Sequence, residues 1–292
     1  MKPIKNVTIG ISTYGELPRA HLLINSIYKH ISDKPADVNL EIVLCDDGTN
    51  PAHLGERREF CKRNRVRLIE HGVNRGISQV WNTIVEQSPN ADMIIINSDG
   101  VRHISTGWLS RMIYFLEKNE RIGGIGTPTV GNPNDYHPEE SRYSGTPGLV
   151  GCPVGCSFAF RKEVHQLIQN IDGSIGFWNS LLSFHEELNF FLALAREGYL
   201  SYMLPFPASY YRGGMAFGIH PELVWRNEDP YLSKDEFLRW ARESQWYTPQ
   251  YEQYYDTGQF GRMMFSRIMF AKYWGILDEC MNGRRYQDIK QE

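Results

Sequence analysis

Apolar residues along this chain fall into short runs that alternate with segments of helical spacing. The runs Val7–Ile11, Glu41–Cys45 and Met93–Ile96 are bounded by polar residues and are predicted to be strands. Met93–Ile96 contains no polar side chain, which is typical of a strand buried on both faces of a parallel sheet. The intervening segments repeat apolar residues every three or four positions, as amphipathic helices do. This alternation predicts an α/β fold in which helices flank a mostly parallel sheet.

Polar side chains follow each of these three strands at the point where the strand is predicted to end. Ser12–Tyr14 follow the first strand, Asp46–Thr49 the second and Asn97–Asp99 the third. The carboxyl ends of parallel strands lie at one edge of a sheet, where open α/β folds bind their ligands. We therefore expect hydroxyl and carboxylate groups from three strands to meet at one rim. Such a rim suits a sugar nucleotide and a divalent metal.

Three further segments give predictions about individual helices and strands. Arg57–Arg65 is rich in charge and is predicted to form a solvated helix. Ser157–Phe160 is predicted to be another strand. A helix is predicted to begin near Ser183, and its apolar face is expected to consist of Leu188, Phe191, Leu192 and Ala195.

The helix near Ser183 carries two adjacent acidic residues in its first turn. Ser183 and Glu186 have capping-box spacing, in which the first-turn glutamate bonds back to the N-cap amide, so Glu186 has a structural explanation. Glu187 has no such explanation. The helix dipole keeps a first-turn carboxylate ionised, which is useful in a general base but also favours an exposed charge with no chemical role. Glu187 and Glu186 are the candidate catalytic residues.

Asn97–Ser98–Asp99 resembles a D-x-D metal motif in which the first Asp is replaced by Asn. Mg²⁺ and Mn²⁺ prefer hard oxygen ligands and often bind through one or two carboxylates together with substrate phosphates. The carboxylate of Asp99 and the amide of Asn97 could hold such a metal more weakly than two carboxylates. The alternative is that Asp99 is a turn residue before Gly100. Asp46–Asp47–Gly48 is likewise a common turn when taken alone.

Length, charge and cysteine content limit the class of protein. The chain has 292 residues and a formal net charge of −3, so no overall positive charge attracts nucleic acid or anionic membrane. Its five cysteines have no framework spacing, which indicates reduced thiols. The sequence shows neither the h-region of a signal peptide nor an apolar stretch long enough to span a bilayer. We expect a cytoplasmic protein, or one that is peripheral at a membrane.

The chain changes character after residue 126. Residues 126–150 are rich in turn-forming residues and are predicted to be a substrate-facing loop or a disordered segment. We expect a catalytic domain over residues 1–225 and a helical, aromatic-rich extension over residues 226–292 that packs on it. Within the extension, Gly261–Trp274 is apolar with interspersed basic residues, a pattern typical of a core helix and also of an interfacial helix for a lipid-linked acceptor.

Taken in order, these motifs resemble those of a family 2-type GT-A glycosyltransferase over residues 6–215. The matching pieces are Ile11–Tyr14 for the first-strand motif, Asp46–Thr49 for D-D-G-S, Asn74–Gly76 for N-R-G, Asn97–Asp99 for D-x-D, Gly155–Arg161 for the acceptor-side G-x-x-x-x-x-R segment, and Glu186–Glu187 before Gly198–Tyr199 for the E-D helix and its G-Y. Each piece alone is weakly specific, whereas six in family order are a strong signal. The resemblance implies a GT-A fold, which is Rossmann-like.

The resemblance also implies roles for individual residues. The residues that would contact the donor nucleotide are Ser12, Thr13, Tyr14, Asp46, Asp47, Arg75 and Ser98. Asp99 would hold a divalent metal, Mn²⁺ or Mg²⁺, and Glu187 stands where the family places its catalytic Asp. Relatives often carry a metal-binding His near Tyr210–Gly214, where this chain has none. His220 is close in sequence, and Arg212 could steady the phosphates of the leaving group.

The implied function is transfer of a sugar from a nucleotide-sugar donor, usually a uridine nucleotide, to an acceptor hydroxyl with inversion of configuration. A saccharide, a lipid-linked glycan, a protein and a hydroxylated DNA base all remain open as acceptors, and the oligomeric state is open too. A catalytically inactive glycan- or nucleotide-binding module is the alternative that Asn97 favours. A sugar nucleotidyltransferase is a further alternative, although Gly10–Gly15 does not supply the glycine-rich loop of that class.

Overall fold

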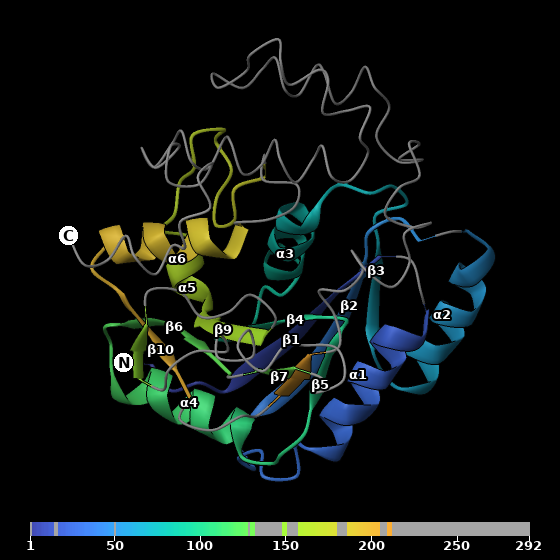
Figure 1. Cartoon of the computed structure of the whole chain (residues 1–292), viewed down its shortest axis with the longest axis horizontal. Helices are drawn as coiled ribbons and strands as arrows, with labels where there is room; N and C mark the ends of the chain where they lie inside the picture. Colours follow the sequence, from blue (N-terminus) through green and yellow to red (C-terminus); the bar gives the residue numbers. More distant parts are fainter. Residues whose placement is uncertain are drawn as a thin grey trace.

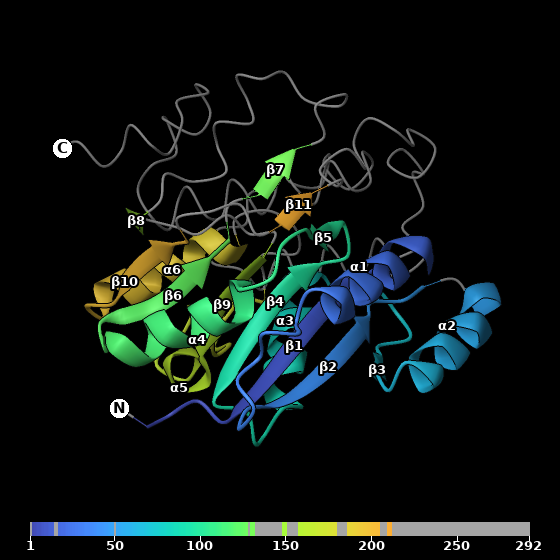
Figure 2. The same cartoon turned by 90° about the horizontal axis from the view of Figure 1, so that it is seen from below.

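An eight-stranded sheet forms the centre of the described part of the protein (Figure 1), and a three-stranded sheet lies beyond one end of its strands (Figure 2). The structure is a computed structural model that describes residues 2–14, 17–49, 51–127, 129–131, 148–150, 157–179, 186–204 and 209–211. The large sheet has the spatial order β3 (Arg67–Glu70), β2 (Asn39–Asp46), β1 (Asn6–Thr13), β4 (Met93–Ser98), β9 (Ser157–Arg161), β6 (Ile122–Gly126), β10 (Leu200–Met203) and β8 (Gly148–Val150). The small sheet has the order β5 (Val101–His103), β11 (Ser209–Tyr211) and β7 (Thr129–Gly131).

The strand directions confirm the mostly parallel sheet expected from the alternation. β3, β2, β1 and β4 are parallel neighbours. β9 is antiparallel to both β4 and β6, which flank it. β10 returns to the parallel direction beside β6, and β8 is antiparallel to β10 at the edge. The direction of β9 decides which end of that strand reaches the ligand-binding rim.

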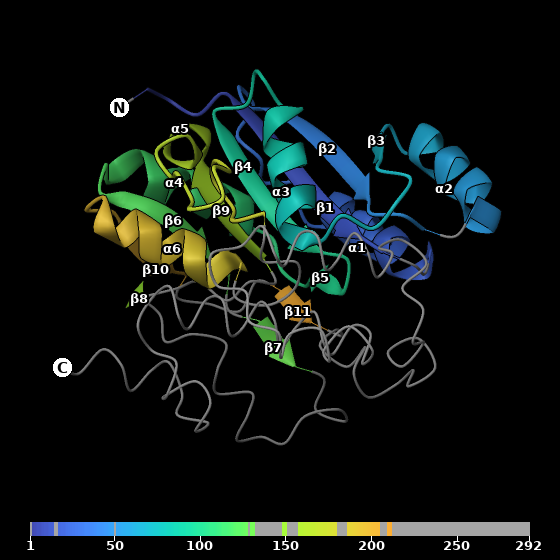
Figure 3. The same ribbon diagram turned by 90° about the horizontal axis from the view of Figure 1, so that it is seen from above.

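Helices cover both faces of the large sheet (Figures 2 and 3). Their bounds are α1 (Leu17–Lys29), α2 (Pro51–Arg63), α3 (Ile77–Glu86), α4 (Trp108–Lys118), α5 (Lys162–His165) and α6 (Glu186–Arg196). Residues of α1, α2 and α4 share one apolar cluster with the sheet, and residues of α3, α5 and α6 share a second cluster on the other face. Among the described helices, none is long and apolar enough to cross a membrane.

Successive side chains of β4 point to opposite faces of the sheet, so this strand contributes residues to both apolar clusters. Ile95 belongs to the cluster under α1 and α4, whereas Ile94 and Ile96 belong to the cluster under α3 and α6. Two glycines let helices lie directly on the sheet. A Cβ atom at Gly10 would lie 2.5 Å from the side chain of Ile84 in α3, and one at Gly124 would lie 2.1 Å from Phe191 in α6.

The face that α6 buries differs from the expected one. Phe190, Phe191 and Leu194 are buried, together with Asn189, whereas Ala195 is exposed. The prediction is confirmed for Phe191 and wrong for Ala195, whereas Leu188 and Leu192 are half-buried. The buried face is shifted because the helix packs on aromatic residues of β9. Phe190 and Phe191 contact Phe160 and Phe158 of β9, with ring centroids 5.0 and 5.3 Å apart.

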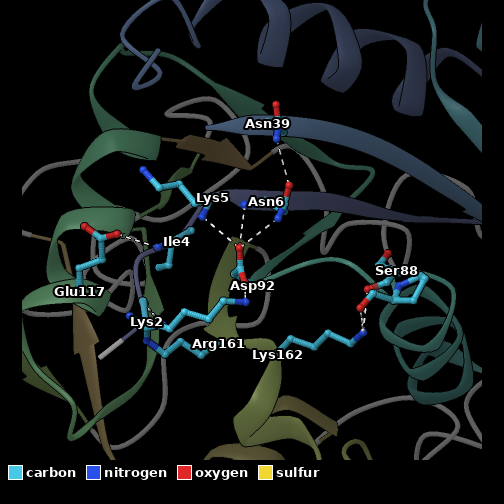
Figure 4. Close-up of polar contacts among 11 residues, drawn as sticks. Lys2, Ile4, Lys5, Asn6, Asn39, Ser88, Asp92, Glu117, Arg161 and Lys162 are labelled. Atoms are coloured by element: carbon cyan, nitrogen blue, oxygen red, sulfur yellow. Dashed lines mark hydrogen bonds and ion pairs between the residues drawn. The ribbon is translucent and has the colours of Figure 1, made fainter. Parts of the chain in front are cut away.

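Asp92 precedes β4 and lies at the end of the sheet opposite the rim, where β1 and β4 begin (Figure 4). Its carboxylate accepts hydrogen bonds from the backbone amides of Lys5 (3.0 Å) and Asn6 (2.9 Å) and pairs with the ammonium of Lys2 (2.6 Å). Burial favours the neutral acid, but Lys2 and the two amides outweigh burial and hold the pKa of Asp92 below its usual value. These contacts fix the start of β1 beside the start of β4.

Arg161 also lies at this opposite edge, because β9 runs antiparallel to β4 and places Arg161 beside Met93 (Figure 4). The side chain is buried and donates hydrogen bonds to the main-chain oxygens of Leu116 (3.1 Å) and Lys2 (3.1 Å). Of the segment Gly155–Arg161, the first two residues lie outside the described residues, Ser157 lies beside Asn97 at the rim end of β9, and Arg161 lies at the far end, so whether the segment faces an acceptor stays a prediction. Arg161 connects β9, α4 and the N-terminal segment.

His165 at the end of α5 gives a testable contribution to acid stability. Burial, followed by the charge of Lys162, lowers the pKa of His165 to about 4, and its Nε2 lies 2.8 Å from Oδ1 of Asn82. The unfolded chain binds a proton below about pH 6.5 whereas the folded chain does not, so this residue lowers stability as the pH falls from 6.5 to 4, by about 1.4 kcal/mol per pH unit.

The measurement compares urea unfolding of the wild type and His165→Gln between pH 6.5 and 4.5, because glutamine keeps a donor for Asn82 and does not titrate. We expect the stability advantage of the wild type over the variant to shrink steadily towards low pH. Parallel pH profiles for the two proteins would contradict the prediction. The comparison with a variant is needed because Glu186 and Glu187, whose pKa values are raised by burial, titrate in the opposite sense.

Candidate glycosyl-transfer site

The register of β1 with its two neighbours brings the three predicted polar segments to one rim. Thr13 stands beside Asp46 of β2, and Ser12 stands beside Ser98 of β4. Thr13 Oγ1 donates a hydrogen bond to Oδ2 of Asp99 at 2.9 Å. The rim is therefore a connected set of groups at the carboxyl ends of β1, β2 and β4, where an open α/β sheet binds ligands.

Ser12 faces the other side of the sheet from Thr13. Its hydroxyl accepts a hydrogen bond from Nε1 of Trp81 in α3 (3.3 Å) and lies 3.4 Å from the main-chain oxygen of Asn97. The Ser12 side chain therefore connects β1 to α3 and β4. Tyr14 follows at the end of β1 with an exposed side chain (46%), a position suited to contact with a ligand.

Asp46 is the centre of a buried ion pair that the sequence pattern did not predict. Its Oδ1 accepts hydrogen bonds from the backbone amides of Gly48 (3.1 Å) and Thr49 (2.7 Å). Its Oδ2 pairs with the guanidinium of Arg57, which also donates to Thr49 Oγ1. Arg57 is fully buried, so the expectation of a solvated helix over Arg57–Arg65 is wrong at its first residue.

Asp47 joins the loop after β2 to the turn after β3. Its Oδ1 accepts hydrogen bonds from the backbone amide of Arg75 (2.8 Å) and from Nδ1 of His71 (2.9 Å), and its Oδ2 accepts one from the amide of Gly76 (3.0 Å). Gly48 is required at this junction, because its φ is +89° and a Cβ atom would lie 2.6 Å from the backbone nitrogen of Asn74. His71 had no motif to mark it; its only signal is its place directly after β3.

Asp99 lies among positively charged groups. Burial raises the pKa of Asp99, and the hydrogen bond from Thr13 and the guanidinium groups of Arg19, Arg102 and Arg57 oppose that rise. Arg102 Nη1 also donates to the main-chain oxygen of Asp99 at 2.8 Å. The sequence pattern did not mark Arg19 and Arg102, because they belong to α1 and β5. Positive charge of this kind is suited to the phosphates of a nucleotide.

Asn97 does not reach the rim surface. Its side chain is fully buried, and the alternation along β4 places it on the same face as Ile95, under α1 and α4. Neither its Oδ1 nor its Nδ2 has a hydrogen-bond partner among the described residues, and Ser157 Oγ, opposite it on β9, has none either. The expected pairing of Asn97 with Asp99 as two metal ligands is not what this structure shows.

The described residues fit a divalent metal only through Asp99. In the described part of the chain, no three His, Cys, Asp or Glu side chains come close enough together to hold a metal ion. Asp99 presents a hard oxygen at the rim, which suits Mg²⁺ or Mn²⁺ bound mainly through substrate phosphates and water. His220, the other candidate ligand, and Arg212, the candidate for phosphate binding, lie outside the described residues.

Glu186 and Glu187 begin α6 at the end of that helix nearer α3, because the chain leaves its other end towards β10 (Figures 1 and 3). Burial, and then the charge of Glu187, raises the pKa of Glu186 well above its usual range. Burial also raises the pKa of Glu187. Burial of two adjacent carboxyl groups therefore favours a retained proton on the pair. Ser183, the expected N-cap, lies outside the described residues.

The segment before these glutamates is attached to α3 through Asn82. Asn82 Nδ2 donates to the main-chain oxygen of Phe177 (2.7 Å) and to Oδ1 of Asn179 (2.8 Å), and its Oδ1 accepts from the amide of Phe177 (2.9 Å). Trp81, the preceding residue, contacts Ser12. Helix α3 therefore contacts both the rim and the segment Phe177–Asn179, which precedes α6 in the chain. No sequence motif assigns Asn82 a role.

Comparison with known proteins agrees with this geometry. A model of the family "Glycosyl transferase family 2" matches residues 8–168, more than half of the chain. The chain belongs to glycosyl transferase family 2. A comparison with curated proteins finds no significant match.

Solved structures of glycosyltransferases have the same fold as this family 2 protein. The mannosyltransferase PcManGT from Pyrobaculum calidifontis, in complex with GDP-Man and Mn²⁺, superposes with a TM-score of 0.59 and 16% identity, over 94% of this chain and 76% of that one. GalNAc-T7 with UDP, GalNAc and Mn²⁺ superposes with a TM-score of 0.58 and 16% identity, over 99% of this chain and 58% of that one. TarS of S. aureus (residues 1–349) gives 0.55 and 15%, over 94% and 76%. At these identities the likeness shows the fold, which is GT-A.

Proposed function

We propose that this family 2 protein transfers a sugar from a UDP-sugar to an acceptor hydroxyl with inversion at the anomeric carbon. The observation that carries the proposal is the meeting of Thr13, Asp47 and Asp99 at the carboxyl ends of β1, β2 and β4. The nucleotide would lie along this rim, with the base towards Asp47 and Tyr14 and the diphosphate towards Arg75 and Asp99. Two of the structural neighbours are complexes with nucleotide-sugar components and Mn²⁺, which supports the donor class and the metal.

In the proposed reaction Glu187 accepts the proton of the acceptor hydroxyl. The acceptor oxygen forms a bond to the anomeric carbon while the bond from that carbon to the diphosphate oxygen breaks, and the nucleoside diphosphate leaves with the electron pair. The guanidinium groups of Arg19 and Arg102 add positive charge on the leaving-group side. A divalent metal held by Asp99 would supply further charge neutralisation on the diphosphate.

The donor assignment is tested by calorimetry with UDP, GDP and ADP, each with and without Mn²⁺. We expect UDP to bind more tightly than ADP, because Asp47 can accept a hydrogen bond from the ring N–H of uracil, which adenine lacks. Equal or tighter binding of ADP would contradict the uridine assignment. A screen of nucleotide-sugar hydrolysis would then identify the sugar, and an acceptor screen would separate saccharides, lipid-linked glycans, proteins and hydroxylated DNA.

The metal site gives a second prediction. Asp99→Ala removes the rim carboxylate, and we expect at least about a 10²-fold loss of transfer activity with an unchanged fold. Asp37→Ala, which removes an exposed carboxylate paired with Lys5, is the matched control and should keep full activity. Full activity of the wild type in excess EDTA would show that the arginines alone neutralise the leaving group.

Asn97→Asp tests whether residue 97 is a metal ligand, as the resemblance to D-x-D implies, or a buried residue that does not reach the metal. Because Asn97 is fully buried and has no hydrogen-bond partner among the described residues, Asn97→Asp would place an unpaired carboxylate in the interior, and we expect lower stability without tighter Mn²⁺ binding. Urea unfolding and Mn²⁺ titration by electron paramagnetic resonance measure the two quantities. Tighter Mn²⁺ binding with unchanged stability would show that residue 97 reaches the metal.

The alternative function is a glycan- or nucleotide-binding module without catalysis. The burial of Asn97 favours it, because it leaves one described carboxylate at the metal position. Such a module would bind UDP but show neither donor hydrolysis nor sugar transfer with any acceptor. Turnover that depends on Glu187 would exclude it.

A further inference from the structure

We propose that His71 is a positioning residue for the donor nucleobase, which fixes the carboxylate of Asp47 so that one acceptor position remains for an N–H of the base. The inference rests on the proposed function and adds to it a residue that no motif marks. His71 follows β3 directly and lies between the loop after β2 and helix α3. It touches the reaction only through Asp47.

Three hydrogen bonds to the Asp47 carboxylate restrict its orientation and occupy most of its acceptor positions. A carboxylate offers about four lone-pair positions, two on each oxygen. Oδ1 receives two donors, from His71 and from the amide of Arg75, and Oδ2 receives one, from the amide of Gly76. Among the contacts that the described residues make, one position on Oδ2 is left. It can accept from the ring N–H of uracil, thymine or guanine, whereas adenine and cytosine present a bare ring nitrogen at the corresponding edge.

The direction of each hydrogen bond fixes the tautomer of His71. The carboxylate of Asp47 can only accept, so Nδ1 of His71 carries a hydrogen and donates it. In the neutral ring Nε2 is then an acceptor, and Thr83 Oγ1 donates to it at 3.0 Å. Thr83 belongs to α3, the helix whose Trp81 donates to Ser12 at the rim. His71 therefore ties the orientation of Asp47 to α3.

The His71 ring and the Asp47 carboxylate lie in a site that is largely closed to water. Both side chains are largely buried, with 5% of His71 and 8% of Asp47 exposed. The Sγ atom of Cys45 lies 3.6 Å from Nε2, and burial, followed by the charge of Asp47, raises the pKa of the Cys45 thiol to about 12, so it stays neutral. A hydrogen bond to a charged group in such a site contributes more than a neutral one on the surface.

Two substitutions of His71 test the roles of its two ring nitrogens, Nδ1 and Nε2, separately. His71→Asn keeps a side-chain N–H near the position of Nδ1 and can still donate to Asp47. His71→Gln places its amide nearer the position of Nε2 and leaves Asp47 one donor short. We expect UDP to bind to His71→Asn within about twofold of the wild type and to His71→Gln about tenfold more weakly, since hydrogen bonds to charged groups have effects of this order.

The control is His30→Gln, which changes a histidine just after α1 and should keep wild-type affinity. The KM for the donor should rise in His71→Gln while kcat at saturating donor stays near the wild-type value, a split that loss of folded protein would not produce. Thr83→Val keeps His71 and removes the donor to Nε2; ¹⁵N NMR of the ring should show the Nδ1–H tautomer in the wild type and a mixture in this variant.

The outcomes distinguish this inference from the proposed function. If the wild type binds none of UDP, GDP and dTDP, the proposed function fails. If the wild type binds UDP and His71→Gln binds it equally well, the proposed function stands and the positioning role of His71 is overturned. An Nε2–H tautomer in the wild type would overturn the inference as well. If His71→Gln fails to fold, the ¹⁵N NMR of Thr83→Val decides: a mixture of tautomers supports the inference, and an unchanged Nδ1–H tautomer contradicts it.

Discussion

Glu187→Gln is expected to lower the rate of sugar transfer by about 10²–10⁴-fold while leaving UDP affinity unchanged. Glutamine matches glutamate in size but cannot accept the proton of the acceptor hydroxyl. Because burial raises the pKa of Glu187, we also expect the wild-type rate to fall with decreasing pH through a midpoint above the ordinary glutamate value. Steady-state kinetics across pH, with calorimetry for the donor, measure both effects.

The adjacent variant Glu186→Gln is the matched control. Burial and the charge of Glu187 raise the pKa of Glu186 well above its usual range, which favours the neutral acid that glutamine imitates. We expect this variant to keep much of the wild-type rate. An unaffected Glu187→Gln enzyme, or a product that retains the configuration of the donor when its anomeric centre is examined by NMR, would contradict the inverting mechanism.

Arg57→Met is expected to cost about 3–5 kcal/mol of unfolding free energy, the largest stability change among these variants. The guanidinium is fully buried and pairs with Asp46, whose carboxylate is 1% exposed. Removing the cation leaves Asp46 as an uncompensated charge inside the protein. The variant should also bind UDP more weakly, because Asp46 holds the amides of Gly48 and Thr49 next to Asp47.

Arg58→Met, one residue further along α2, is the control. Arg58 makes a two-point contact with Glu70, with distances of 2.8 and 2.7 Å, but its side chain is 58% exposed. Exposed pairs contribute about 1 kcal/mol or less. Urea unfolding of both variants makes the comparison. In a double-mutant cycle, Asp46→Asn should recover part of the loss caused by Arg57→Met, and strictly additive losses would contradict a direct buried pair.

The pattern of apolar and polar residues was sufficient to predict the layered fold. The apolar runs that became β1, β2 and β4 are local patterns, and a run without polar side chains is stable only in the middle of a covered sheet. The position of the polar segments after those runs could also be predicted from neighbouring residues alone, because the residues that follow a strand ending at the rim lie at the rim. The order of residues along the chain was therefore enough to predict that Thr13, Asp47 and Asp99 lie at one rim of the sheet, whereas their roles in the reaction stay predictions.

The burial of individual charged and polar side chains, and the partners they contact, depend on how distant segments pack together in the folded chain. A charged residue in a helix rich in charge is expected to face solvent, and only the folded chain shows that Asp46 of β2 lies against Arg57 of α2 in the interior. Asn97 looked like a ligand from its spacing, but the residue's face depends on strand alternation, and what covers that face comes from α1 and α4. The antiparallel direction of β9 moved Arg161 to the far edge. The pairing of His71 with Asp47 crosses two loops, and because no local propensity specifies contacts between loops, only the folded chain reveals it.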